Sequence, residues 1–440
     1  MLQRKIILWS LIVALGGFLF GFDTAVISGA EQAIQKYWSL NDFQHGLTVA
    51  IALIGTAFGA LLGGIPSDKL GRKGTLFLIA ALFLFASLGT ALATNWYAFL
   101  LFRFLGGLGV GASSVTAPIY ISEISPARNR GKLVALFQFN IVFGILVSYL
   151  SNYLIGLSGE GSWRLMLGVQ AVPSLVFLLL IRFIPESPRW LILKRGRIEE
   201  ARATMQIIDP TGFDQDLMEI QKTSAAAVKE SASIFSNKYR RPVMLAMLLA
   251  LFNQLSGINA IIYFAPRIFE MSGLAKSSSL LSTVGIGVVN FSFTLLAMNF
   301  IDRFGRKTLM KIGSIGLVLT LGLASYAFYQ HIGGWAITVA LLMYIAFFAF
   351  SQGAVIWVFI SEIFPNEVRA RGQTLGSSTH WIMAVIIAFN FPYFADKFGG
   401  GPIFLFFCLM MILQMIFVWR VMPETKGKSL EQIGDTVILH

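Results

Sequence analysis

The chain has 440 residues, of which 56% are hydrophobic and 13% charged, and it carries a net charge of +12. An ordinary soluble protein has about 25% charged residues, so this composition argues against a soluble enzyme, a disordered chain and a nucleic-acid-binding protein. In so apolar a chain, the excess of Lys and Arg indicates that these residues lie on one side of a membrane. The single cysteine, Cys408, excludes an internal disulfide and argues against a cysteine-ligated metal site.

Twelve apolar runs follow one another along the chain, and each has about the 20 residues that a helix needs to cross a bilayer. They cover residues 6–30, 44–65, 74–94, 96–121, 132–155, 163–184, 242–268, 279–301, 308–329, 335–361, 373–395 and 402–421. The first run is too long for the apolar core of a signal peptide, so no cleaved leader is expected. The sequence therefore predicts an all-α membrane protein with twelve transmembrane helices.

Basic residues are concentrated in every second connection between these spans. The N-terminal segment, every connection from an even-numbered to an odd-numbered span, and the C-terminal segment are rich in Lys and Arg, whereas the other connections hold few. Basic loops face the cytoplasm. We therefore expect a multi-pass plasma-membrane protein (the inner membrane, in a bacterium) with both termini cytoplasmic.

Three pairs of motifs divide the chain into two halves. They centre on Asp68 and Asp302, Glu123 and Glu362, and Glu186 and Glu424, which are 234, 239 and 238 residues apart. Such a constant offset predicts two pseudo-symmetric six-helix bundles, residues 1–184 and 242–440, joined by a cytoplasmic linker at 185–241. Short helices are expected in the linker at 197–208 and 213–230, and an unstructured linker is the alternative.

Charged side chains of these loops predict networks at the cytoplasmic ends of the helices. Ion pairs of this kind can form in one state of a transporter and break in the other. The alternative is that the charges only end helices and set the topology. The candidate residues are Asp68, Arg72, Glu123, Arg130, Glu186, Arg189, Asp302, Arg306, Glu362 and Arg371.

Further motifs give the chain a resemblance to a known family. They are Arg103–Gly111, Pro118–Glu123, Pro185–Trp190, Gln254–Asn259 and Pro423–Gly427. Together with the repeated loops, they resemble the sugar porter branch of the major facilitator superfamily, especially bacterial sugar–proton symporters of the xylose–proton type and, more distantly, glucose facilitators. The resemblance implies alternating access, with a proton as coupling ion and no cofactor. A monomer is expected, and no motif of an enzyme is present.

Two ionisable residues interrupt spans in the expected outer half of the membrane, Asp23 in the first span and Arg103 in the fourth. A charge at mid-membrane costs about 2.5–3.5 kcal/mol on insertion scales, so such residues indicate function. Both lie roughly 10 Å below the outer face at ~1.5 Å per residue, so they can pair if the helices adjoin. The resemblance implies that Asp23 takes the coupling proton with Arg103 as partner. A structural ion pair without coupling is the alternative.

A neutral sugar needs amide and indole hydrogen-bonding groups and aromatic faces against its C–H surface. The candidate contacts within the spans are Gln138, Asn253, Gln254, Asn259, Asn290, Trp357 and Trp381, with Phe20 and Phe264 as further rings. The resemblance implies sugar contacts at most of these positions. Each amide alone can equally hold helices together, and core packing is the alternative for the phenylalanines.

The chain departs from the symporters that it resembles at several of these positions. Asn253 precedes Gln254 where two glutamines are usual, and Ile145 and Ala384 replace polar residues. His380 stands where an amide is usual, and contacting the sugar, titrating and packing between helices are three open roles for it. These differences leave the identity of the sugar open.

The leading hypothesis is the import of a neutral monosaccharide, a hexose or a pentose, by proton symport across the lipid bilayer. A facilitative sugar uniporter without proton coupling is the first alternative. A non-transporting sugar sensor would need a long signalling tail, which is not expected here. A drug or organic-anion carrier is disfavoured because the central candidates are amides and indoles. Neither a metal nor a nucleic-acid partner is expected.

Overall fold

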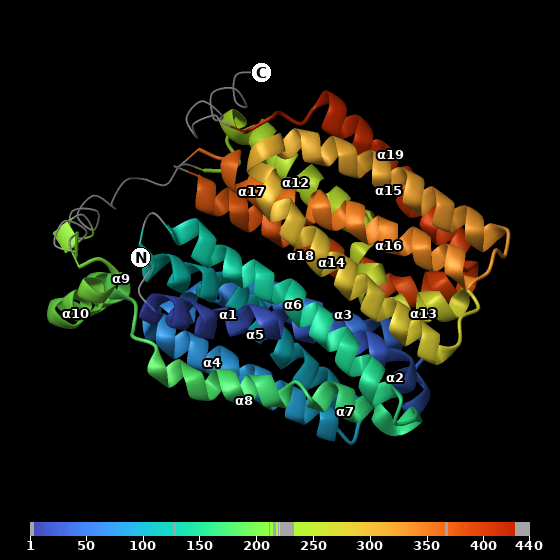
Figure 1. The fold of residues 1–440 in the computed structure, drawn as a ribbon, viewed down its shortest axis with the longest axis horizontal. Helices are drawn as coiled ribbons and strands as arrows, with labels where there is room; N and C mark the ends of the chain where they lie inside the picture. The colour runs from blue at the N-terminus through green and yellow to red at the C-terminus, as the bar shows by residue number, and fades with distance from the viewer. Residues whose placement is uncertain are drawn as a thin grey trace. The chain divides into compact units, whose positions relative to one another are not determined.

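The computed structural model describes residues 4–426 except 127–128, 211, 214–216, 219, 221–232 and 366–367, and the described residues form helices and connections without a strand (Figure 1). The predicted helix at 213–230 lies mostly outside the described residues, whereas the one predicted at 197–208 is confirmed as α10 (Ile198–Ile208). The prediction of an all-α fold is therefore confirmed.

Among the described residues, twelve helices or pairs of helix segments are long and apolar enough to span a membrane, and they match the twelve predicted spans. The first six spans and the connection after them contain α1 (Arg4–Val26), α2 (Glu31–Tyr37), α3 (Asp42–Leu62), α4 (Gly64–Leu92), α5 (Trp96–Glu123), α6 (Arg130–Gly156), α7 (Trp163–Gly168), α8 (Ala171–Leu180) and α9 (Pro188–Trp190). The last six contain α12 (Arg240–Leu255), α13 (Ile258–Met271), α14 (Lys276–Phe304), α15 (Arg306–Tyr329), α16 (Gly334–Phe350), α17 (Gln352–Glu362), α18 (Arg369–Phe398) and α19 (Gly400–Arg420).

The chain forms two compact units. One comprises Met1–Thr24, Ile51–Ser148 and Arg164–Glu230, and the other comprises Ala25–Ala50, Tyr149–Trp163 and Ser231–His440. The second unit therefore includes the ends of the first, second and fifth spans that lie away from the repeated basic loops. The division into bundles at residues 184 and 242 remains a prediction.

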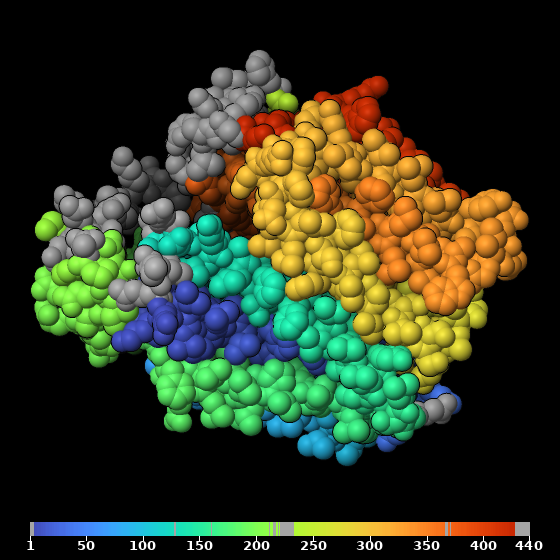
Figure 2. Space-filling model, in the orientation of Figure 1, coloured from blue at the N-terminus to red at the C-terminus, as the bar shows by residue number. Residues whose placement is uncertain are grey.

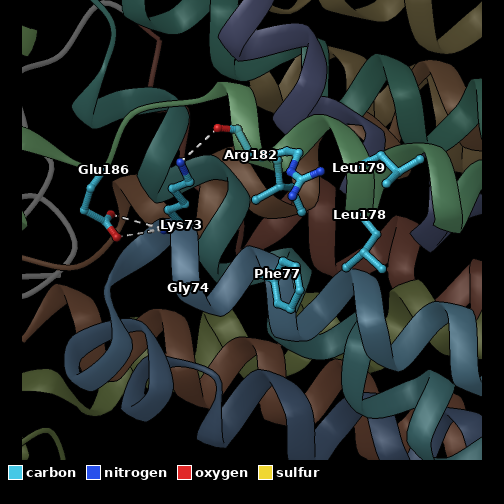
Figure 3. Close-up of a pocket in the computed structure, with 8 residues that line it drawn as sticks. Lys73, Gly74, Phe77, Leu178, Leu179, Arg182 and Glu186 are labelled. Carbon is cyan, nitrogen blue, oxygen red and sulfur yellow. Dashed lines mark hydrogen bonds between the residues drawn. The ribbon is translucent and has the colours of Figure 1, made fainter.

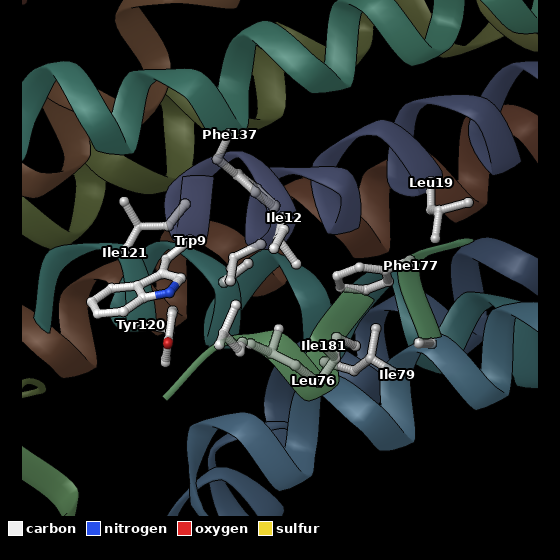
Figure 4. Packing of buried hydrophobic residues seen from close by; sticks show 14 of the residues in the cluster. Trp9, Ile12, Leu19, Leu76, Ile79, Tyr120, Ile121, Phe137, Phe177 and Ile181 are labelled. Carbon is white, nitrogen blue, oxygen red and sulfur yellow. The ribbon is translucent and has the colours of Figure 1, made fainter. Parts of the chain in front are cut away.

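The first unit packs around side chains of α1, α4, α5, α6 and α8 (Figure 4). Trp9, Phe137 and Phe177 are among its buried rings. Glycines let α3 and α5 approach closely, because a Cβ on Gly107 would collide with the carbonyl oxygen of Ala52. The glycine-rich motif of the fourth span thus serves helix packing.

The second unit has its own buried core, formed by α12, α14, α15, α17 and α19 and by residues in the adjoining connections, such as Phe364 and Met422. Large apolar side chains remain exposed along α14, among them Leu281, Val288 and Leu296, seven or eight residues apart. This helix lies on the surface of the unit (Figure 2). An exposed apolar stripe of this kind suits contact with lipid, since it would be a liability in water.

The seventh span is broken where the sequence carries its amide motif. Helix α12 ends at Leu255 and α13 begins at Ile258, with Gly257 between them at φ +86°. This backbone conformation favours glycine, and a Cβ there would lie 2.5 Å from the Phe407 ring. The Tyr344 hydroxyl donates to the freed carbonyl oxygen of Ser256 at 2.9 Å. The break therefore places buried polar backbone and side chains at mid-span, as discontinuous transporter helices do.

Candidate transport site and charge networks

The predicted ion pair is present inside the first unit. Arg103 on α5 donates through Nη1 to Oδ1 of Asp23 on α1 at 3.1 Å. Asp23 is 4% exposed and Arg103 2% exposed. The Nε and Nη2 atoms of Arg103 are buried without a hydrogen-bond partner among the described residues. The guanidinium therefore keeps unused donors beside Asp23.

An amide cluster spans the break between α12 and α13 in the second unit. The side-chain amide of Gln254 donates to Asn253 Oδ1 at 3.0 Å, and Asn259 donates to Gln254 Oε1 at 2.7 Å. Gln254 and Asn253 are almost fully buried, and Asn259 is half-buried. Because each amide carries donors and acceptors on one polar head, the cluster can exchange these internal bonds for sugar hydroxyls.

His380 on α18 joins this cluster to two indoles. Its ring nitrogens lie 3.2 and 3.3 Å from Gln254 Nε2. Its ring centroid lies 4.9 Å from that of Trp357 on α17 and 5.0 Å from that of Trp381. Trp357 is 40% exposed, whereas Trp381 is 9% exposed. Trp357 therefore offers the more accessible aromatic face, and the three predicted roles of His380 remain open.

Other sequence-predicted contacts stand apart from this cluster. Asn290 on α14 is half-buried, and no hydrogen bond of the described residues joins it to the cluster. Gln138 on α6 and Phe20 on α1 are partly buried in the first unit. Phe264 is fully buried and stacks on Phe391 with centroids 4.8 Å apart. Packing therefore accounts for Phe264.

A charge network closes the repeated loop of the first unit. Arg72 donates from Nε and Nη2 to the two carboxylate oxygens of Glu123, at 3.0 and 3.1 Å. Its Nη1 lies 3.2 Å from Asp68. Glu186 accepts from the backbone N–H groups of Arg72 and Lys73, at 2.9 and 3.1 Å. The network ties the third and fourth spans to the connection that follows the sixth span.

The second unit repeats this arrangement. Arg306 donates to Glu362 at 2.8 Å and lies 3.1 Å from Asp302. Glu424 accepts from the backbone N–H groups of Arg306 and Lys307, each at 3.0 Å. The sequence repeat therefore corresponds to a repeat of contacts, with each copy formed inside its own unit. We call the end that carries these networks the motif end.

Two hydroxyl side chains complete the networks and were missed by the sequence reasoning. Ser187 donates to Glu123 at 2.5 Å, and Thr425 donates to Glu362 at 2.6 Å. The repeated motifs Pro-Glu-Ser and Pro-Glu-Thr could have indicated these residues. Ser187 directly follows Glu186, and Thr425 directly follows Glu424. Burial raises the pKa of Glu186 above its ordinary value, and the backbone N–H groups of Ser187, Lys73 and Arg72 oppose this shift.

Two predicted network residues, Arg130 and Arg189, are placed outside the two networks. Arg130 donates to the carbonyl oxygen of Ser122 at 3.2 Å instead of to a carboxylate. Arg189 is exposed on α9, and no interaction of the described residues joins it to either network. Arg371 is exposed near the start of α18.

A cavity of about 650 Å³ lies beside the first network (Figure 3). Apolar side chains of α4 and α8, including Phe77 and Leu178, form most of its wall, and Arg182 lines it as well. Lys73 donates through Nζ to the carbonyl oxygen of Ile184 at 2.7 Å. All lining residues belong to the first unit, so this cavity is separate from the amide cluster of the second unit.

Known proteins are similar to this chain over nearly its whole length. The family model "Sugar (and other) transporter" matches residues 9–436. The "Glucose transport protein" of Synechocystis sp. is 38% identical, with 98% of this chain and 97% of the relative covered. The "D-xylose-proton symporter" of Escherichia coli strain K12 is 35% identical, with 96% of this chain and 94% of the relative covered.

A solved structure gives the same result in three dimensions. The inward-open conformation of the xylose transporter XylE from E. coli has a TM-score of 0.87 and 33% sequence identity, covering 97% of this chain and 98% of that structure. Relatives and fold are those of transporters, so the expectation that the chain is not an enzyme is confirmed. With its twelve apolar helices, the chain is a multi-pass membrane protein that belongs to the sugar (and other) transporter family, within the sugar porters of the major facilitator superfamily.

Proposed function

We propose that this protein imports a neutral monosaccharide together with a proton by alternating access. The buried Asp23–Arg103 pair is the observation that supports this proposal most. The proton affinity of the Asp23 carboxylate depends on its distance from the Arg103 guanidinium. Burial disfavours an ionised aspartate, and a neighbouring arginine favours it. If Arg103 withdraws during transport, Asp23 takes up a proton, and proton binding becomes linked to the change of state.

The amide cluster and its indoles form the part of the sugar site that the second unit contributes. Gln254, Asn259 and His380 offer hydrogen-bonding groups, and Trp357 offers an exposed ring. None of these groups is a permanent charge, which suits a neutral ligand with many hydroxyls. Gln138, Asn290 and Phe20 remain candidates for the rest of the site.

The membrane orientation follows from charge. The motif end carries Arg72, Lys73, Arg306 and Lys307, so it faces the cytoplasm under the positive-inside rule. Both termini then also face the cytoplasm, and the bacterial relatives make the inner membrane the natural location. The two networks lock the cytoplasmic helix ends within each half and release them when the halves reorient.

The test is Asp23→Asn in proteoliposomes with an imposed pH gradient. We expect the variant to lose proton-driven accumulation and to retain exchange of labelled sugar against unlabelled sugar, because exchange needs no net proton movement. Glu199→Gln on α10, where Glu199 is exposed, is the matched control and should accumulate sugar normally. Undiminished accumulation by Asp23→Asn would refute the coupling role.

A facilitative uniporter is the second candidate. The relatives include a protein named as a glucose transport protein as well as a proton symporter, so the uniporter is kept as the alternative. A wild-type protein that equilibrates sugars without responding to the pH gradient would establish this alternative. Uptake of glucose and xylose, measured one sugar at a time, would define the substrate class in the same vesicles.

A further inference from the structure

A second cluster of buried polar groups lies at the end of the helices opposite the motif end. It belongs wholly to the second unit. Glu31 on α2 and His45 on α3 are both 0% exposed. Their contact joins His45 Nε2 to Glu31 Oε2 at 2.6 Å. A carboxylate and an imidazole without access to water are costly to bury, so this pair calls for an explanation beyond packing.

Arg267 on α13 completes the cluster. Its Nη1 lies 3.1 Å from His45 Nδ1 and 3.4 Å from Glu31 Oε2. Its Nη2 donates to Gln35 at 3.3 Å and to Asp396 on α18, also at 3.3 Å. The cluster thus joins the ends of the first two spans, within residues 25–50, to two helices of the last six spans.

The protonation state of His45 follows from its partners. An arginine side chain can only donate, so Nδ1 must accept from Arg267, and neutral His45 carries its proton on Nε2. A second proton would have to occupy Nδ1, where it would face the N–H groups of Arg267. Arg267 and a proton therefore compete for one nitrogen atom.

The local charge balance has room for that proton. Glu31 and Asp396 each contribute −1 and Arg267 contributes +1, so the three sum to −1. Glu270 interacts electrostatically with Glu31 and Arg267 of this cluster and also with Lys276, and the charges of Glu270 and Lys276 cancel each other. Protonated His45 would bring the sum to zero. Within the described part of the chain, Glu31 Oε1 is also buried without a hydrogen-bond partner, so the carboxylate keeps capacity to stabilise an imidazolium.

We infer that His45 Nδ1 is a second proton-binding site, separate from Asp23, which is filled only when Arg267 moves away. A proton arriving from outside then favours separation of the first two spans from α13. The inference rests on the proposed orientation and alternating access. Proton binding at His45 would open the outer side of the transporter at low external pH, whereas Asp23 would bind the proton that is transported.

The opening can be measured directly by distance spectroscopy. Spin labels at Tyr37→Cys and Ser277→Cys, in a Cys408→Ser background, report the separation of α2 from the start of α14, and both positions are exposed. One proton changes the open-to-closed ratio by at most about tenfold per pH unit. We expect the wild-type ratio to rise at least about threefold between about pH 8 and about pH 5.

Three variants identify the group responsible. His45→Gln keeps an acceptor for Arg267 that does not titrate, so it should abolish the pH response. His331→Asn replaces an exposed histidine outside the cluster and should preserve the response. Arg267→Met removes the competing donor and should favour the open population even at about pH 8, which provides an independent test if His45→Gln folds poorly.

The outcomes separate this inference from the proposed function. Asp23→Asn should lose proton-driven accumulation and keep the pH-dependent opening. If wild-type protein fails to transport sugar yet opens in acid, the proposed function fails and the inference stands. A full pH response in His45→Gln, or no response in the wild type, overturns the inference.

Discussion

At the scale of single residues, polar side chains in this chain work in pairs that can exchange partners. Asn259 bonds to Gln254, and Gln254 also contacts His380. Each bond between neutral groups contributes about 0.5–1.5 kcal/mol net. A sugar that replaces such bonds therefore gains a modest amount from each, and its affinity depends on the whole set.

Truncation of Asn259 should weaken sugar binding. Asn259→Ala removes the amide donor and leaves Gln254 Oε1 without that partner. We expect KM for sugar exchange to rise about tenfold, which corresponds to a loss of ~1.4 kcal/mol. Asn299→Ala removes an exposed amide on α14 and is the matched control. Equal KM values in both variants would remove Asn259 from the site.

The indole of Trp357 should matter in a different way. It is the more exposed of the two tryptophans beside His380. Aromatic stacking is worth about 0.5–1.5 kcal/mol beyond burial of area, so Trp357→Ala should raise KM by several-fold. Trp419→Ala, at an exposed indole of α19, is the control. Sugar-induced quenching of tryptophan fluorescence should disappear only in Trp357→Ala.

At the scale of elements, two glycines set the geometry of the repeated loops. Gly71 has φ +86° and ψ 170°, and Gly305 has φ +89° and ψ 162°. Such values are essentially restricted to glycine and cost other residues about 1–3 kcal/mol. The turn aims the next two backbone N–H groups at Glu186 in one unit and at Glu424 in the other. The conformation of each glycine is therefore required for the hydrogen bonds that its partner glutamate accepts.

Alanine at either glycine should destabilise the protein. A Cβ on Gly71 would overlap the Glu186 carboxylate, and one on Gly305 would lie 2.6 Å from Glu424 Oε2. We expect Gly71→Ala and Gly305→Ala to lower the thermal unfolding temperature by a similar amount. Gly64→Ala, where a Cβ meets nothing within 4 Å, should leave it unchanged. An unchanged temperature in both turn variants would contradict this account.

The sequence predicts some features of these elements well and others poorly. Twelve spans follow from hydropathy, and the partners of Arg72 and Arg306 follow from a repeat that places equivalent charges at equivalent helix ends. The break at Gly257 could not be predicted from hydropathy, because two residues leave the apolar run intact. The cluster of Glu31, His45 and Arg267 belongs to none of the three repeated motif pairs, and Arg267 lies more than 200 residues from the other two. Only the packed helices bring them together.

At the scale of the whole molecule, charge distribution defines two faces. In the proposed orientation, the motif end faces the cytoplasm and residues 30–41 face the outside. Impermeant thiol reagents applied to intact cells should label Ser277→Cys and spare Ser236→Cys, both in a Cys408→Ser background. Both positions are exposed at opposite helix ends. The reverse labelling pattern would invert the proposed orientation.

The break at Gly257 has a mechanical consequence for the sugar site. Gln254 lies before the break and Asn259 after it, so any rotation of α13 about Gly257 changes the spacing of the two amides. A sugar bonded to both restrains that rotation, and the rotation in turn selects how tightly the sugar is held. The affinity for the sugar and the angle of α13 are then linked by one coupling free energy. Because Tyr344 anchors Ser256 to α16, the motion is confined to the α13 side.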